Sequence, residues 1–178
     1  IAYDMRPNRR LQLLTDVRFS TMATYMYEDA VKLPVALFVV ELLTTVARHE
    51  HENRQLFEFV DASIDVLELD GEHTANFHLV FMTMLTRLVG IAPDEETYAA
   101  GSWLDLREGC FTLLRPAHQD VAQPEVARRI ALFLRGGFEG VAMPMNRDER
   151  NCCLDALMDY YRLHLPSFPE LKSVAILR

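Results

Sequence analysis

The sequence predicts an all-α fold, a helical bundle with a small irregular or β-hairpin insertion and one strand near the N-terminus. Apolar residues recur at the three- and four-residue spacing of amphipathic helices from about residue 33 onward, whereas residues 11–19 alternate as a strand does. Of the 178 residues, 50% are hydrophobic and only 7 are Gly and 8 are Pro, so the chain can bury a sizeable core. We therefore expect one folded domain with an appendage.

The appendage is residues 1–27. Apolar and polar side chains alternate from Leu11 to Phe19 with a period near two, which is typical of a strand. A lone strand needs a sheet, and the rest of the chain offers little to pair with it. We therefore interpret this segment as the tail of a preceding β domain and residues 28–178 as the helical domain. Because the sequence opens on Ile1 rather than Met, we expect it to be part of a longer chain.

Two helices open the helical domain. One begins near Leu33, where Pro34 suits the first turn because its missing N–H would have no partner there, and ends near His49. The other begins after Asn53, a suitable N-cap, and ends at Gly71. The residues at helical spacing are Leu37, Phe38, Glu41, Leu42, Thr45 and Val46 in the first helix and Leu56, Phe57, Val60, Ile64 and Leu67 in the second.

A third helix, from Asn76 to Leu88, is apolar on most sides, so it should lie at the centre of the bundle. Asn146 and Glu149 match a capping box at the start of a long later helix. The glycine-rich residues 136–140 are interpreted as a flexible connection. Later helices are expected over residues 124–134, 147–165 and 170–177.

The helical pattern lapses over residues 93–123, which we treat as an insertion. Two short apolar runs, Trp103–Leu106 and Cys110–Leu114, lie on either side of Gly109. Because glycine readily adopts the positive φ of a tight turn, this arrangement predicts a short hairpin.

The charge distribution argues against a dedicated nucleic-acid-binding surface in the middle of the chain. The net charge is −8, and residues 28–100 hold 14 acidic and 4 basic residues, a net charge of −10. Nearly all the cations are Arg, which can hold a carboxylate or a phosphate through two hydrogen bonds. Pairing with the acidic middle third is the favoured interpretation, and a phosphate or acidic-peptide site is the alternative. The C-terminal cations are Arg147, Arg150, Arg162, Lys172 and Arg178.

No catalytic or metal-binding motif stands out. The cysteines, Cys110 and the adjacent Cys152 and Cys153, form no C-x-x-C pair, and Cys110 has no identifiable His partner. Residues 49–52 (His-Glu-His-Glu) place two His at i and i+2, which do not share a helical face, so a solvated helix end is favoured over a metal site. His78, on an apolar helix, is interpreted as a satisfied core histidine. We expect no enzyme, no metal and no cofactor.

Targeting signals are also missing from the sequence. No apolar run reaches membrane-spanning length, and the N-terminal arginines are followed by no signal-peptide core. We therefore expect a soluble protein in the cytoplasm.

The order of several segments is similar to that of a known family. These segments are residues 32–43 (KLPVALFVVELL), 53–59 (N-x-x-L-F-x-F), 76–93 (N-F-H-L-x-F, then L-V-G-I-x-P), 103–111 (W-L-D-x-x-E-G-x-F) and 160–177 (Y-Y-R-L-H-L-P, then L-K-S-V-x-x-L). Together they resemble the helical domain of the RecO family of DNA repair proteins, in its Bacteroidetes branch. The resemblance covers nearly the whole chain.

The resemblance implies a recombination mediator without catalytic turnover. Such proteins bind the acidic, hydrophobic tail of single-stranded DNA-binding protein, partner with RecR, anneal DNA strands and help to load RecA at the nucleoid. They bind single- and double-stranded DNA mainly through an N-terminal OB-fold, of which residues 11–19 would be the last strand. The residues left to contact DNA phosphates in this chain would be Arg6, Arg9, Arg10 and Arg18.

Two further expectations follow from the resemblance. Many relatives carry a four-cysteine zinc module where this chain has only Cys110, so we expect no zinc and a hairpin packed by Trp103 and Phe111 instead. The family's tail-binding site lies around the helix at residues 76–88. It points to Phe81 and Leu85 as the groove and to Arg87 as the cation that receives the terminal carboxylate.

An alternative is a helical small-ligand-binding or regulatory domain of another class. A closed apolar cavity between the helices would favour that alternative.

Overall fold

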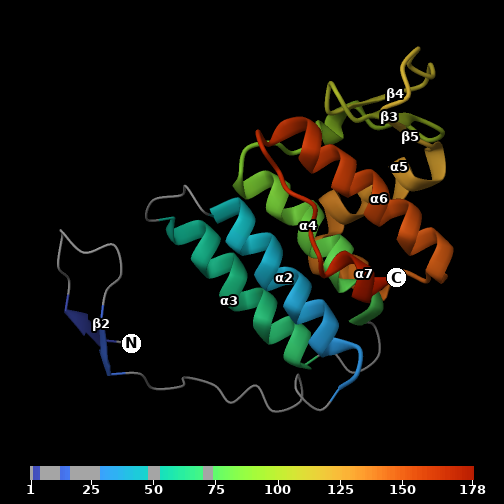
Figure 1. The fold of residues 1–178 in the computed structure, drawn as a ribbon. Helices are drawn as coiled ribbons and strands as arrows, with labels where there is room; N and C mark the ends of the chain where they lie inside the picture. The colour runs from blue at the N-terminus through green and yellow to red at the C-terminus, as the bar shows by residue number, and fades with distance from the viewer. Residues whose placement is uncertain (1, 5–12, 17–28, 48–52, 70–73) are drawn as a thin grey trace.

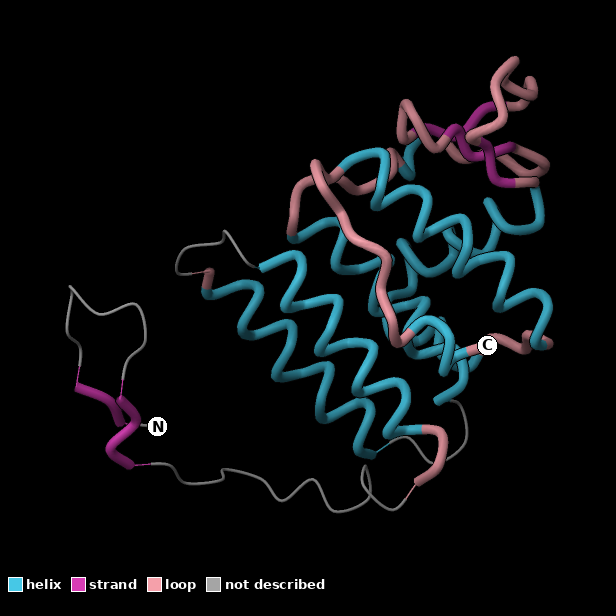
Figure 2. The backbone as a smooth tube through the Cα atoms, viewed as in Figure 1, coloured by secondary structure: helices cyan, strands magenta, loops and turns pink. Residues whose placement is uncertain are grey.

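The computed structural model describes residues 2–4, 13–16, 29–47, 53–69 and 74–178, and statements about structure below concern these residues (Figure 1). They form a bundle of helices with a small sheet at one end and a separate pair of strands near the N-terminus (Figures 1 and 2). The helices are α2 (Lys32–Val46), α3 (Arg54–Leu69), α4 (Phe77–Leu88), α5 (Pro124–Gly136), α6 (Arg147–His164) and α7 (Val174–Leu177), with short 3-10 helices at Thr74–Asn76, Glu95–Thr97 and Gly137–Ala142. The strands are β1 (Ala2–Asp4), β2 (Leu13–Asp16), β3 (Trp103–Asp105), β4 (Cys110–Thr112) and β5 (Val121–Ala122).

Polar side chains fix where the helices begin. Asn53 Oδ1 accepts a hydrogen bond from the backbone N–H of Leu56 at 3.0 Å, which confirms the expected N-cap of α3. At α6, Asn146 and Glu149 form the expected capping box, with bonds of 2.9 and 2.8 Å. Just before α2, the carboxylate of Asp29 accepts hydrogen bonds from the backbone N–H groups of Val31 and Lys32, which was not expected from the sequence.

Helix α4 lies at the centre, as expected. Nine of its twelve residues are buried, and it packs against α2, α3, α5 and α6. The hydroxyl of Tyr161 on α6 donates to the backbone carbonyl of Met82 at 2.9 Å, so a buried hydrogen bond joins the two helices. Most of the hydrophobic core therefore packs against this helix.

The faces of α2 and α3 differ from the prediction. Leu37 is 50% exposed, Phe57 is 69% exposed and Ile64 is 45% exposed, whereas Leu56 and Leu67 are buried. The two helices lie side by side on one flank of α4 (Figure 1), where both pack against α4 and α2 also packs against α7, so their outer faces stay exposed. When a helix has apolar residues on more than one face, its sequence does not show which face will be buried.

The insertion is a three-stranded antiparallel sheet in the order β4–β3–β5. The expected β3–β4 hairpin is present and Gly109 has a φ of +65°, but β5 was not predicted because two residues carry no periodicity. The ring of Phe111 packs edge-on against Tyr98 at 5.3 Å, and the guanidinium of Arg115 lies 5.2 Å from the centre of the Trp103 ring. Aromatic packing therefore supports the hairpin.

The expectation of a flexible connection at residues 136–140 is wrong. The chain forms a 3-10 helix, Gly137–Ala142, that packs on α4 and α5. A Cβ on Gly140 would lie 2.7 Å from Cδ1 of Phe133, so the glycine there permits close packing.

Near the N-terminus, β2 confirms a strand within the range expected, and it pairs antiparallel with β1. Assignment of residues 1–27 to an OB-fold stays a prediction. None of the described helices is long and apolar enough to cross a membrane.

Candidate functional site

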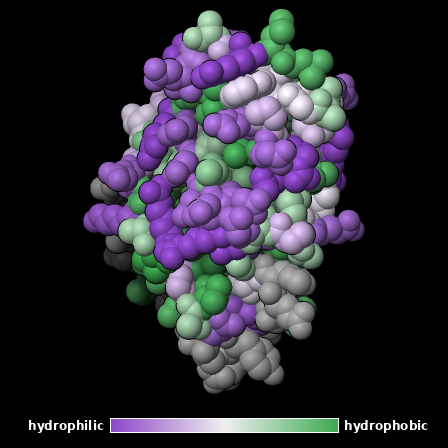
Figure 3. Space-filling model, turned by 90° about the vertical axis from the view of Figure 1, so that its right-hand side faces the viewer, coloured by the Kyte–Doolittle hydropathy of each residue, from purple (hydrophilic) through white to green (hydrophobic). Residues whose placement is uncertain are grey.

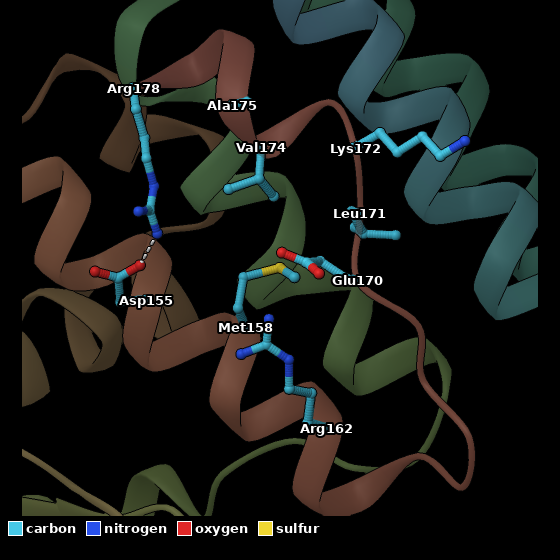
Figure 4. Close-up of a pocket in the computed structure, with 9 residues that line it drawn as sticks. All are labelled: Asp155, Met158, Arg162, Glu170, Leu171, Lys172, Val174, Ala175 and Arg178. Carbon is cyan, nitrogen blue, oxygen red and sulfur yellow. Dashed lines mark hydrogen bonds and ion pairs between the residues drawn. The ribbon is translucent and has the colours of Figure 1, made fainter.

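A pocket of about 680 Å³ lies between α6 and the C-terminal segment (Figure 4). We call it the C-terminal pocket. Its base is apolar, because Met158 and Leu171 are buried and Val174 is half-buried. The lining residues are Asp155, Met158, Arg162, Glu170, Leu171, Lys172, Val174, Ala175 and Arg178.

The chain turns back on itself to form this pocket. The segment after α6 contains Pro166 and Pro169, which cannot continue a helix, and it runs back along the bundle to α7 (Figure 2). Glu41 on α2 holds its far end: the carboxylate accepts hydrogen bonds from the backbone N–H of Lys172 at 3.0 Å, from the N–H of Ser173 at 2.8 Å and from the Ser173 hydroxyl. The hydroxyl bond is the main reason why the pKa of Glu41 is lowered, against the opposing effect of burial.

Arg162 and Arg178 stand at the rim, and both already have acidic partners. Arg162 Nη1 lies 2.8 Å from Asp159 Oδ1, and Arg178 pairs with Asp155. The paired side chains are about half exposed, and such surface ion pairs contribute little stability, so an incoming carboxylate can exchange with them. The side chain of Lys172 points away from both arginines (Figure 4).

The residues that line the pocket are either apolar or charged, and His, Cys and Ser are not among them. An apolar base with arginines at the rim suits a partner that is both acidic and hydrophobic. On the side of the molecule that Figure 3 shows, hydrophilic side chains predominate and hydrophobic ones form scattered patches.

Phe81 and Leu85, expected to line a peptide groove, are fully buried in α4. The Phe81 ring packs against the rings of Phe59 and Phe77, at 5.1 and 6.1 Å. Neither side chain offers surface to a peptide in this structure. Whether the tail binds near this helix stays a prediction.

Arg87, the third expected residue, does lie at the surface. Its Nη2 is 2.5 Å from Glu95 Oε2 and donates to the carbonyl of Leu134 at 2.9 Å. Arg135 Nη2 donates to the backbone carbonyl of Glu95 at 3.1 Å, and its guanidinium lies 5.3 Å from the centre of the Tyr98 ring. We call Arg87, Glu95, Tyr98 and Arg135 the Arg87 cluster. Arg87 pairs with the Glu95 carboxylate whereas Arg135 contacts only its backbone carbonyl, so the two arginines and one carboxylate of the cluster carry a net positive charge.

The C-terminal arginines differ from the favoured interpretation, which paired them with the acidic middle third. Arg162 and Arg178 pair with Asp159 and Asp155 of α6, their own part of the chain. The sequence could not show this, because a pair such as Arg178 and Asp155 depends on how the last segment folds back.

Two stretches that the sequence brought into question lie outside the described residues. One is residues 49–52, interpreted as a solvated helix end, and the other holds the arginines expected to contact DNA, which are Arg6, Arg9, Arg10 and Arg18. In the part of the chain that the structure describes, no group of three His, Cys, Asp or Glu side chains could hold a metal ion.

Polar contacts hold the insertion together where relatives were expected to have zinc. Burial of Asp105 would raise its pKa, but hydrogen bonds from the backbone of Glu108 and Arg107 and from His118 outweigh it, and the pKa is lowered. The backbone bonds measure 3.1 and 2.9 Å, and His118 Nε2 lies 3.1 Å from Asp105 Oδ2. Burial also raises the pKa of the nearby Cys110 thiol. An Asp at the start of a turn is a recognisable signal that the sequence analysis missed.

Comparison with known proteins gave a consistent result. Residues 27–174 match the family model described as "Recombination protein O C terminal". Proteins named DNA repair protein RecO from Phocaeicola vulgatus and Bacteroides fragilis are 38% and 39% identical to the chain, over 98% of its length and 73% of theirs. A protein of the same name from Porphyromonas gingivalis is 36% identical over 99% of the chain and 74% of its own length. No solved structure matches.

Proposed function

The chain belongs to the RecO family of DNA repair proteins, and from this premise we propose that it is the helical part of a recombination mediator that binds partners and has no catalytic turnover. The proposed partners are the acidic tail of single-stranded DNA-binding protein, RecR, and single- and double-stranded DNA, the last mainly through a preceding OB-fold. By binding these partners, the protein would assist DNA strand annealing and the loading of RecA, in the cytoplasm at the nucleoid. Family membership and the names of the relatives support the role in DNA repair and recombination.

The C-terminal pocket is the proposed site for the acidic tail. The observation that carries this proposal is the combination of an apolar base, formed by Met158 and Leu171, with Arg162 and Arg178 at the rim. Apolar side chains of a tail would enter the base, while its carboxylates would displace Asp155 and Asp159 from the arginines. The Arg87 cluster is the competing location, since the family resemblance pointed to α4 and two arginines meet there.

Peptide binding tests the proposal. A fluorescent peptide with several Asp residues and a C-terminal Phe is titrated against the wild-type chain and against Arg162→Ala/Arg178→Ala, Arg87→Ala and Arg54→Ala variants, at two salt concentrations. Arg54 is the matched control, because it is an exposed arginine on α3 that also pairs with an acid, Glu58. We expect the double variant to bind about tenfold more weakly, since charged hydrogen bonds contribute about 1.5–3 kcal/mol when desolvated and less at the surface. Binding should weaken as salt rises.

The variants separate the possible outcomes. Loss of affinity in Arg87→Ala alone would move the site to the Arg87 cluster. Absence of binding by the wild-type chain at low salt would overturn the proposal that this domain recognises an acidic tail.

A further inference from the structure

A second pocket, of about 190 Å³, lies where α2, α4, α6 and α7 meet. We call it the His78 pocket. Its walls are mostly apolar, and only His78 and Arg150 bring polar side-chain atoms to it. The lining residues are Ala30, Val31, Pro34, Val35, Ala75, His78, Arg150, Ile176 and Leu177.

His78 is 3% exposed and makes no hydrogen bond with any described residue. Its Nδ1 is enclosed without a partner, and the ring meets Phe38 edge-on at 6.1 Å. Burial, and then the positive charge of Arg150, lower the pKa of His78 to about 3, so the ring is neutral at physiological pH. The histidine is therefore a core residue, as the sequence suggested, but not a satisfied one. A buried polar group without a partner is uncommon and calls for an explanation, of which a bound water, ion or ligand is one.

Arg150 is the second unusual feature. Its Nη1 donates to the backbone carbonyl of Met145 at 2.6 Å, but within the described chain no carboxylate pairs with it. Arg129, on the neighbouring α5, shows the contrast, because Glu149 and Glu125 both lie beside it. The pocket therefore contains an unpaired cation next to an unpaired imidazole.

We propose that the His78 pocket binds a small carboxylic acid with a compact apolar body. The carboxylate would pair with the free guanidinium nitrogens of Arg150 and accept a hydrogen bond from the His78 ring, while the apolar walls would cover the rest of the ligand. The volume suits this class, because a cavity of about 150 Å³ accommodates benzene. A water molecule could form a hydrogen bond with His78. It would, however, leave Arg150 without a negatively charged partner and the apolar walls in contact with water.

The proposal does not depend on the proposed function. Helix α7 separates the two pockets, since Val174, Ala175 and Arg178 line the C-terminal pocket whereas Ile176 and Leu177 line the His78 pocket. A small acid could therefore bind without occupying the peptide site.

The test uses benzoate and its neutral analogue benzamide as probes on the whole chain. NMR titration follows the His78 ring signals and the backbone of α7. We expect benzoate to shift these signals with saturation and benzamide to bind at least about tenfold more weakly, because only the anion can pair with Arg150. Arg150→Met should weaken benzoate about tenfold, while Arg147→Met, an exposed arginine one turn earlier on α6, should leave it unchanged.

Several results would overturn the proposal. Equal binding of benzoate and benzamide would remove the role of the charge, and benzoate binding unchanged in Arg150→Met would place the anion elsewhere. Absence of any saturable shift in the wild-type chain would leave water as the occupant of the pocket. Displacement of benzoate by the acidic peptide would mean that the two pockets form one site. Comparing the two probes on the wild-type chain decides the question even if a variant fails to fold.

Discussion

The two flanks of α4 are held by different kinds of contact. On one flank, α2 and α3 rest on α4 mainly through apolar stripes, and Leu37, Phe57 and Ile64 face outward. On the other flank, hydroxyl groups of α6 reach backbone carbonyls: Tyr161 donates to the buried carbonyl of Met82 on α4 at 2.9 Å, and Tyr160 donates at 2.7 Å to the partly buried carbonyl of Ile91, just after α4. The hydrophobic effect is non-directional, whereas a hydrogen bond is directional and so adds a specific constraint on the position of α6.

That difference bears on function because both pockets use α6 as a wall. Met158 and Arg162 bring α6 to the C-terminal pocket, and Arg150 brings it to the His78 pocket. A helix fixed by specific hydrogen bonds keeps these side chains in place before a ligand arrives. On the α2–α3 flank, the carboxylate of Glu41 anchors the C-terminal segment by accepting hydrogen bonds from its backbone.

The largest effect is expected where the insertion meets α6. Gly109 has a φ of +65°, and a Cβ there would lie 2.6 Å from the Tyr160 hydroxyl. Gly109→Ala combines left-handed backbone strain with this overlap, so we expect a loss of about 3 kcal/mol in the free energy of unfolding. Urea denaturation measures it. Gly101→Ala is the matched control, because Gly101 also has a positive φ but no atom lies within 4 Å of the added Cβ, and it should cost about 1 kcal/mol. Equal losses in the two variants would show that the overlap with the Tyr160 hydroxyl adds nothing to the cost.

A smaller effect is expected at the Glu41 anchor. Glu41→Gln keeps the shape but removes the charge that strengthens three hydrogen bonds to Lys172 and Ser173, so we expect a loss of about 1 kcal/mol at neutral pH. The pKa of Glu41 is lowered in the folded chain. Its contribution is therefore present above the usual carboxyl pKa and is lost as the pH falls through the folded-state pKa.

Denaturation at several pH values tests the anchor. The difference between the wild-type chain and Glu41→Gln should shrink as the pH falls, whereas Glu58→Gln, at an exposed ion pair on α3, should change little at any pH. A difference that stays constant in acid would show that the carboxylate charge does not hold the C-terminal segment.

The smallest effect is expected on the outer face of α3. Phe57 is 69% exposed, so Phe57→Ser should change the free energy of unfolding by no more than about 0.5 kcal/mol. Leu67, on the buried face of the same helix, gives the contrast: Leu67→Ala should cost about 2–3 kcal/mol. Both are measured by urea denaturation. A large loss in Phe57→Ser would mean that another surface covers this face in solution.

Local signals in the sequence were sufficient for features that depend on neighbouring residues. The caps at Asn53 and Asn146 follow from side chains within three residues of the backbone they bind, and both are present. The turn at Gly109 follows from the readiness of glycine to adopt a positive φ, and it is present too. The central place of α4 follows from its composition. Faces of α2 and α3 could not be assigned, because which stripe is buried depends on where α4 lies.

The pockets needed the fold for a similar reason. Glu41 and Ser173 are 132 residues apart, and His78 meets Arg150 only when α4 and α6 pack together. Phe81 and Leu85 were chosen by family position, and their complete burial is visible only in the folded chain.

The most direct test of the central claim, that this RecO-family domain recognises an acidic tail at the C-terminal pocket, is a hydrogen-exchange footprint of the bound peptide. We expect slower amide exchange in residues 155–178 on peptide addition, and unchanged exchange in residues 87–98 and in α3. Protection confined to residues 87–98 would contradict the claim and assign the site to the Arg87 cluster, and uniform exchange at saturating peptide would contradict recognition itself.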